Sequence, residues 1–179
     1  MASEKERMLS GQLYNAYDSY LVAERKQARS LLHRLNITDY GNQVEYSKII
    51  SELLPNCPSD ILIEPPFFCD YGYNIYAGNS VFFNFDCVVL DVCPVRIGSN
   101  VMFGPSVHIY TATHPKDFMK RRDVFEFGKP VSIGDDCWIG GQAVILPGVS
   151  IGQRCIIGAG AVIAKDVTDD TIVTSRHQG

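Results

Sequence analysis

The chain has 179 residues, and its 46% hydrophobic content is enough for one medium-sized domain with a real core, which argues against disorder as the main state. Lys and Arg total 16 against 20 for Asp and Glu, so the net charge is −4, and no basic tract points to nucleic acid as a partner. The charged residues 1–7 precede no apolar run long enough for a signal peptide or a membrane span, so we expect a cytoplasmic protein without a membrane partner.

The N-terminal part has a helical pattern. Over residues 6–54 apolar side chains recur at a spacing near 3.6 among charged ones, in two stretches that Asn36 and Gly41 separate. Two prolines directly after this part stop helix formation, and a Pro-Pro pair then opens a different kind of sequence. We therefore expect a small helical region over residues 1–58 and a second region over residues 59–179.

The second region repeats with a period of six residues. Its most regular part is an unbroken ladder of isoleucines: Ile133, Ile139, Ile145, Ile151, Ile157 and Ile163. Side chains repeat every 3.6 residues in an α-helix and every 2 in a strand, so neither element explains the ladder. A solenoid explains it, because each six-residue unit can supply one short strand and one bend, with the aliphatic side chain buried between stacked coils. We therefore expect a mainly β chain that forms a β-helix.

The cysteines form no CxxC pair and have no zinc-like spacing. They occupy positions 57, 69, 87, 93, 137 and 155. A cytosolic chain keeps its thiols reduced, so we expect free cysteines whose side chains fill apolar space in the core.

Residues 115–130 interrupt the period of six. They carry many charged side chains and few apolar ones, so we expect a loop that leaves the coil. Long loops in compact domains are usually functional or disordered, and this one directly follows His114. Histidine is the side chain most often used for proton transfer in enzymes, which makes His114 a candidate general base.

Several short motifs are more specific than the repeat itself. They lie at residues 64–66, 70–75, 84–94, 110–115 and 138–141. On these motifs the chain resembles the hexapeptide-repeat acetyltransferases, in particular the branch of the maltose, galactoside and nodulation enzymes, from about residue 4 to about residue 173. The resemblance implies a left-handed parallel β-helix preceded by a small helical region on the acceptor side. It also implies a homotrimer in which acetyl-CoA lies between adjacent coils and two subunits share each active site.

The resemblance assigns the acetyl transfer to a few polar residues. Transfer from a thioester to a sugar hydroxyl needs a base, donors for the oxyanion and groups that orient the sugar. His114 matches the catalytic base of the family, and Asn84 matches a position at the acceptor site, where its amide can bind the oxyanion or a hydroxyl. Asp70 and Asp91 match acceptor-binding positions, and Asp91 is also a candidate for orienting the histidine.

Two further carboxylates come from outside the coil. Glu126, near the end of the predicted loop, can hydrogen-bond the imidazole of His114, and Asp18 with Arg25 can close over the sugar from the helical region. Asp70 stands where galactoside enzymes use serine, which favours maltose or glucose as the acceptor. The position of Val92, where those enzymes carry a second acid, leaves the acceptor open, so a galactoside or another small molecule is an alternative.

The resemblance also places coenzyme A. Backbone groups at Gly141 and Ala159 are expected along the pantetheine arm, and Ala164 and Lys165 near the nucleotide. No metal is expected as a cofactor. The chain departs from the family after Val173, where residues 174–179 replace a Gly-Asn-Pro-Ala turn and a basic strand, so we expect weaker contacts to the nucleotide end.

Two other kinds of function remain open from the sequence. A β-helix enzyme similar to γ-class carbonic anhydrase needs three histidines for zinc, but only His108 and His114 lie in the repeat region, while His33 and His177 lie outside it. A β-helix subunit that only assembles with partners would not need a histidine beside a long polar loop.

Overall fold

The computed structural model describes residues 2–39 and 41–174. Its N-terminal part consists of α1 (Glu4–Leu9), β1 (Tyr14–Asn15), α2 (Ser19–Ile37) and α3 (Gln43–Leu53), so the expected helical region is confirmed. The expectation of helix throughout the first stretch is wrong for residues 10–18. There Gly11 takes a left-handed conformation with φ of 73°, and the chain then extends as β1.

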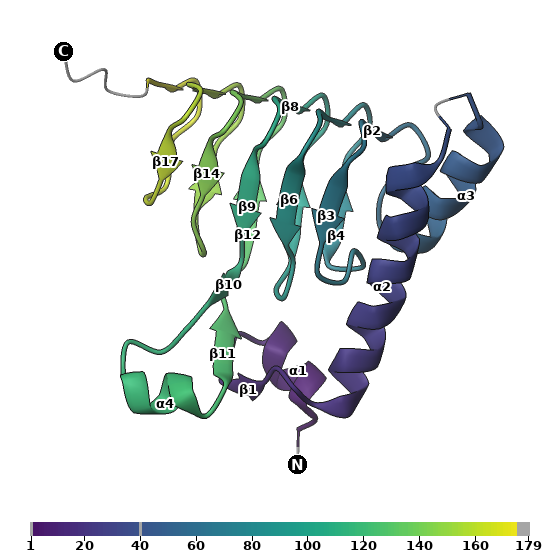
Figure 1. The fold of residues 1–179 in the computed structure, drawn as a ribbon. Coiled ribbons are helices and arrows are strands. Elements are labelled where there is room, and N and C mark those ends of the chain that lie inside the picture. The colour runs from purple at the N-terminus through teal and green to yellow at the C-terminus, as the bar shows by residue number, and fades with distance from the viewer. Residues whose placement is uncertain (1, 40, 175–179) are drawn as a thin grey trace.

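Helices α2 and α3 close one end of the coil (Figure 1). Their buried side chains belong to the same hydrophobic core as the coil: Ala28, Leu31, Leu32 and Leu35 from α2, and Ile49, Ile50 and Leu53 from α3. The first coil would otherwise expose its apolar interior at this end, as terminal units of solenoids do without a cap. The helices therefore seal the core and bring the polar side of α2 next to the coil.

Residues 62–173 form the coil, a left-handed parallel β-helix with three sheet faces, and the predicted fold class is thus confirmed. Face 1 contains β4 (Ile75–Ala77), β7 (Val95–Ile97), β12 (Val131–Ile133) and β15 (Ser150–Ile151). Face 2 contains β2 (Leu62–Ile63), β5 (Phe82–Phe83), β8 (Met102–Phe103), β13 (Trp138–Ile139), β16 (Ile156–Ile157) and β18 (Ile172–Val173). Face 3 contains β3 (Phe67–Cys69), β6 (Cys87–Leu90), β9 (His108–Tyr110), β14 (Val144–Ile145) and β17 (Val162–Ile163).

The isoleucine ladder explains how the coil is built. Successive members lie on successive faces, so each pairs with the member three units later, as Ile139 does with Ile157. All six are at least 96% buried. At the corner after Ile139, a side chain on Gly140 would place its Cβ 2.6 Å from the backbone nitrogen of Ala159, so only glycine allows the coils to approach this closely.

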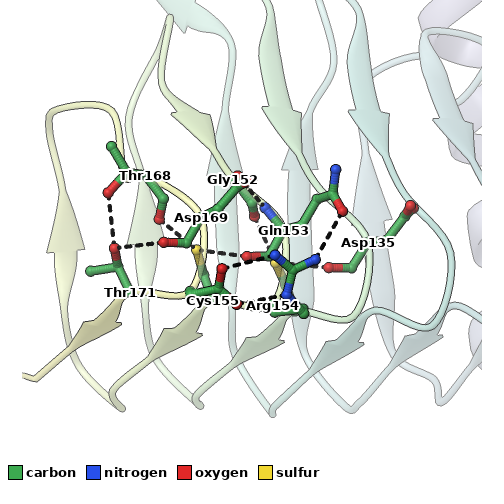
Figure 2. A network of polar contacts seen from close by, with 10 residues as sticks. Asp135, Gly152, Gln153, Arg154, Cys155, Thr168, Asp169 and Thr171 are labelled. Atoms are coloured by element: carbon green, nitrogen blue, oxygen red, sulfur yellow. Dashed lines mark hydrogen bonds and ion pairs between the residues drawn. The ribbon is translucent and has the colours of Figure 1, made fainter.

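Side chains of successive coils hydrogen-bond along the corner between face 1 and face 2. The carboxylate of Asp135 accepts the backbone N–H of Ser99 at 2.7 Å, and that of Asp169 accepts the N–H of Gln153 at 3.0 Å. Figure 2 shows this network around Gln153 and Asp169. These bonds satisfy backbone donors at the bends, which gives the polar residues of this corner a structural role.

The interruption of the repeat is folded, in contrast to the predicted loop. Between β9 and β12 the chain forms β10 (Ala112–Thr113), α4 (Phe118–Arg122) and β11 (Phe125–Gly128), here called the excursion. Strand β11 pairs antiparallel with β10 and also with β1. The phenol of Tyr14, a fully buried residue, donates a hydrogen bond to the carboxylate of Glu126. The N-terminal segment thus holds the excursion in place beside the coil (Figure 1).

Two further expectations concern the thiols and the chain end. All six cysteines are free, and every one except Cys57 is buried, as a filling role requires. The departure expected after Val173 falls almost wholly on residues 175–179, outside the described part. Within the described chain, no helix is long and apolar enough to cross a membrane.

Candidate active site

A cavity of about 640 Å³ opens between α2, the corner that joins face 3 to face 1, and the excursion. Its polar lining comes from segments far apart in the sequence: Arg25, Lys26 and Arg29 of α2, Asp70 after β3, His114 after β10, Arg121 of α4 and Glu126 of β11. Parallel stacking of the coils and the antiparallel pairing of β11 with β1 bring these segments together. The structure therefore places three of the predicted site residues, Asp70, His114 and Glu126, in one cavity.

His114 is exposed to this cavity. It follows β10 directly, and the next residue, Pro115, is buried, so the chain is anchored on both sides of the histidine. Within the described residues the imidazole has no hydrogen-bond partner, which leaves its nitrogens available to a ligand. The expected bond from Glu126 to the imidazole is absent there, and the Glu126 carboxylate accepts the phenol of Tyr14.

Asp70 and Glu126 are two carboxylates in the same cavity. Burial raises the pKa of Asp70 to about 6, and the negative charge of Glu126 acts in the same direction, while the guanidinium groups of Arg25 and Arg29 oppose it. Both carboxylates can accept hydrogen bonds from hydroxyl groups when ionised. The cavity therefore offers two carboxyl groups beside the imidazole of His114.

Asp91 does not contact the cavity, and its predicted role in acceptor binding is corrected here. Its side chain is fully buried. Its Oδ1 accepts the backbone N–H groups of Asp70 and Tyr71 at 3.0 and 2.9 Å, and its Oδ2 accepts those of Gly72 and Asn74 at 2.7 and 3.3 Å. Burial raises the pKa of Asp91 to about 7, against the lowering effect of the N–H donors. Asp91 thus fixes the turn that carries Asp70, and within the described residues it makes no hydrogen bond with His114.

Asp18 also has a different role from the predicted one. It is the residue before the first turn of α2, and its carboxylate accepts the N–H groups of Tyr20 and Leu21 at 3.1 and 3.3 Å. Side chains at this position satisfy the free donors of a helix end. Asp18 does not line the cavity that contains His114, so it is a helix cap in this structure rather than an acceptor ligand.

Arg25 reaches the cavity as expected and is held firmly. Its Nη1 donates to the phenol oxygen of Tyr71 at 2.6 Å, and its Nη2 donates to the carbonyl of Ala16. The guanidinium also lies 5.7 Å from the centre of the Tyr71 ring. This arrangement links α2 to the turn that Asp91 holds.

The remaining predicted residues lie at the two edges of face 3. Asn84, Gly141 and Ala159 follow strands of face 2 and lie at the corner that joins face 2 to face 3. Ala164 and Lys165 follow β17 and lie at the opposite corner, the one that also carries His114. A single chain therefore keeps Asn84 apart from His114, with the whole width of face 3 between them.

The prediction from sequence did not include three cations of this cavity: Lys26, Arg29 and Arg121. A signal for two of them was present, because residues three and four apart on a helix share a face, which places Lys26 and Arg29 beside Arg25. Arg121 had no such signal, since its position depends on how the excursion folds.

The raised pKa of Asp70 gives a testable pH dependence. If Asp70 binds acceptor hydroxyls as a carboxylate, we expect the KM for the acceptor to rise about five-fold as the pH falls through 6, because a charge-assisted hydrogen bond is weakened. Asp70→Asn should have the higher KM at every pH and lose this dependence. Steady-state kinetics of both proteins between pH 5 and 8 measures how the KM for the acceptor depends on pH. A wild-type KM that stays constant across this range would contradict the assignment.

Metal binding has no structural support in the described residues, where no group of three or more His, Cys, Asp or Glu side chains is arranged to hold an ion.

Comparison with known proteins gives two family matches. Residues 7–58 match the maltose acetyltransferase hexapeptide capping motif, which covers the N-terminal helices. Residues 130–165 match the bacterial transferase hexapeptide family, described as six repeats, which covers the most regular part of the coil.

Three similar proteins are informative. Nodulation protein L of Rhizobium meliloti is 47% identical over 165 residues, which are 92% of this chain and 90% of the relative. The crystal structure of a maltose O-acetyltransferase from Clostridium difficile 630 has a TM-score of 0.95 at 44% identity and covers 97% of this chain and 93% of that chain. A hexapeptide-repeat acetyltransferase of Vibrio cholerae, solved as a complex with acetyl coenzyme A, has a TM-score of 0.84 at 36% identity, with coverage of 97% and 94%.

Proposed function

The chain belongs to the hexapeptide-repeat acetyltransferases, and we propose that it transfers the acetyl group of acetyl-CoA to a hydroxyl of a sugar such as maltose or glucose, with His114 as the general base. The observation that carries the proposal is the position of His114, which shares one cavity with the carboxylates of Asp70 and Glu126. An acyltransferase for hydroxyl groups needs this combination of a base and hydrogen-bond acceptors for the sugar.

The chemical step follows from these groups. The imidazole of His114 accepts the proton of the sugar hydroxyl while the oxygen attacks the thioester carbonyl carbon. The amide of Asn84 stabilises the negative oxygen of the tetrahedral intermediate. The carbon–sulfur bond then breaks, the acetyl group stays on the sugar oxygen, and the departing thiolate takes the proton from the imidazolium. No metal is needed in this sequence, because the proton and the oxyanion both have protein partners.

The separation of Asn84 from His114 within one chain supports a site shared between copies. In a homotrimer, the corner of one copy that carries Asn84 can lie beside the corner of the next copy that carries His114. Gly141 and Ala159 would then line one wall of a groove, and Ala164 and Lys165 the other. We propose that acetyl-CoA lies in this groove. The Vibrio cholerae relative, which was solved as a complex with acetyl coenzyme A, supports acetyl-CoA as the donor.

Inside the cavity, Asp70 and Glu126 are the proposed ligands for sugar hydroxyls. The similarity to a maltose O-acetyltransferase favours maltose or glucose, while a galactoside or another small acceptor is the alternative. A β-helix protein that only assembles with partners is the second candidate. Against that candidate stands the polar cavity around His114, which has no role in coil stacking.

An acceptor comparison tests this proposal. Purified protein would be incubated with acetyl-CoA and with maltose, glucose or a galactoside, and released thiol would be measured. We expect thiol release that depends on the acceptor, with maltose or glucose above the galactoside. Higher activity with the galactoside would overturn the acceptor assignment, and no release above background with any hydroxylated acceptor would favour the assembly role.

A further inference from the structure

The cavity that contains His114 has a surplus of positive charge. Arg25, Lys26, Arg29 and Arg121 line it together with only two carboxylates, those of Asp70 and Glu126, which leaves two positive charges in excess. The whole chain, in contrast, has a net charge of −4. The cavity is therefore a local positive site on an acidic protein, and a positive cleft attracts anions.

The carboxylates of the cavity do not account for all of these cations. Arg25 is bound to Tyr71 and Ala16, and its charge together with that of Arg29 lowers the pKa of Asp70. Lys26 and Arg29 form no hydrogen bond or ion pair with any other described residue, and both are exposed. Two donors in the cavity are thus free to bind a ligand.

The cations approach the cavity from two sides. Lys26 and Arg29 are three residues apart on α2, so they share one face of that helix. Arg121 lies on α4, and its Nη1 donates to the carbonyls of Pro115 and Lys116 at 2.8 and 2.7 Å. These bonds hold the guanidinium of Arg121 against the two residues that directly follow His114. A group between α2 and α4 would therefore meet positive charge from both helices.

A neutral sugar does not use these charges. Guanidinium groups bind carboxylate and phosphate with paired, charge-assisted hydrogen bonds, whereas a hydroxyl gives a single weaker bond. Without an anion, the like charges of Lys26, Arg29 and Arg121 repel one another across the cavity. An anionic ligand would remove that repulsion and occupy the free donors.

We propose that the preferred acceptor carries an anionic group, a carboxylate or a phosphate ester, which Lys26, Arg29 and Arg121 bind while one of its hydroxyls faces His114. This inference rests on the proposed acetyl transfer, and it replaces a neutral sugar such as maltose or glucose with a sugar that carries a negative charge as the preferred acceptor. The hydroxyl chemistry at His114, Asp70 and Glu126 stays as described above. What the cations add is selection by charge, mainly through the KM for the acceptor.

Acceptors that differ only in charge test the proposal. With acetyl-CoA at saturation, kcat/KM would be compared for glucose, glucuronate and glucose 6-phosphate. We expect glucuronate or glucose 6-phosphate to exceed glucose by at least about ten-fold, because a charge-assisted contact is worth about one such factor or more. The advantage should shrink in high salt. Preference for glucuronate indicates a carboxylate acceptor, and preference for glucose 6-phosphate a phosphate ester. Equal efficiency of all three overturns the proposal.

Substitutions connect the charge preference to the named side chains. Lys26→Gln and Arg29→Gln should each raise the KM for the preferred anionic acceptor about ten-fold, a larger increase than the one they cause in the KM for glucose. Lys48→Gln removes another exposed lysine, from α3 and outside the cavity, and is the matched control. If the cavity variants change neither constant more than the control does, the cations do not select the acceptor.

Calorimetric titration measures binding of an anion without acetylation, so it tests the anion site independently of the proposed acetyl transfer. Glucuronate and glucose 6-phosphate would be titrated into the wild type and into the double variant Lys26→Gln/Arg29→Gln. Binding to the wild type that is lost in the double variant supports the anion site even if no acceptor is acetylated, in which case only the acetyl transfer fails. Acetylation of glucose without detectable binding of either anion overturns the anion site alone.

Discussion

His114→Ala should lower kcat for acetyl transfer by about 10² to 10⁴ fold, because no other imidazole lines the cavity within the described residues to take the hydroxyl proton. The side chain is exposed and makes no hydrogen bond with described residues, so its removal should leave folding intact. The KM for acetyl-CoA should change little, since the base acts on the acceptor. Steady-state kinetics with both substrates at saturation measures this effect.

A histidine on the surface of α2 provides the control. His33→Ala removes an exposed imidazole outside the cavity and should retain full activity. Treatment with a metal chelator should also leave the wild-type rate unchanged, since the proposed chemistry involves no metal. Activity of His114→Ala within a few fold of the wild type would remove this residue from the mechanism.

Asp91→Ala should destabilise the protein by at least about 4 kcal/mol, since it leaves four donors without their partner and each buried donor left so costs about 1 to 3 kcal/mol. The carboxylate accepts four backbone N–H groups of the turn at residues 70–74, and alanine leaves them without their acceptor. Urea unfolding at pH 8, where the carboxyl is ionised, measures the change in the free energy of unfolding.

Asp123→Ala is the matched control for Asp91. This carboxylate is exposed at the end of α4, so its removal should change the free energy of unfolding by less than about 0.5 kcal/mol. Asp91→Asn keeps the size of the side chain and one acceptor oxygen. Its loss of unfolding free energy should therefore fall between those of Asp91→Ala and Asp123→Ala. A loss below about 1 kcal/mol for Asp91→Ala would mean that the turn does not depend on this carboxylate.

The architecture of the coil could be predicted because its causes are local. Each isoleucine of the ladder fixes the inward side of one short strand. Where a glycine follows the isoleucine, it permits the close approach at the corner, as Gly140 does beside Ala159. The break before α2 and the folded excursion were missed because they depend on each other. Strand β1 pairs with β11, and Tyr14 contacts Glu126 across more than a hundred residues of sequence. No local sequence pattern predicts the pairing of β1 with β11.

The candidate site could be predicted only in part, for similar reasons. His114 and Asp70 belong to short motifs, and the structure brings them into one cavity with Glu126. A motif does not tell whether a carboxylate points outward, so Asp91 was assigned to the acceptor although it faces the backbone of a turn. Asp18 did carry a local signal, because an aspartate directly before a helical pattern is typical of a helix cap.

The mass of the product is the most direct test of acetyl transfer by this chain. Wild-type protein and His114→Ala would each be incubated with acetyl-CoA and an acceptor sugar, and the sugar and the free CoA would be quantified by mass spectrometry. We expect the wild type to form acetylated sugar and free CoA in equal amounts, and His114→Ala to form almost none of either. Free CoA without acetylated sugar, or acetylated sugar formed equally well by His114→Ala, would contradict acetyl transfer with His114 as the base.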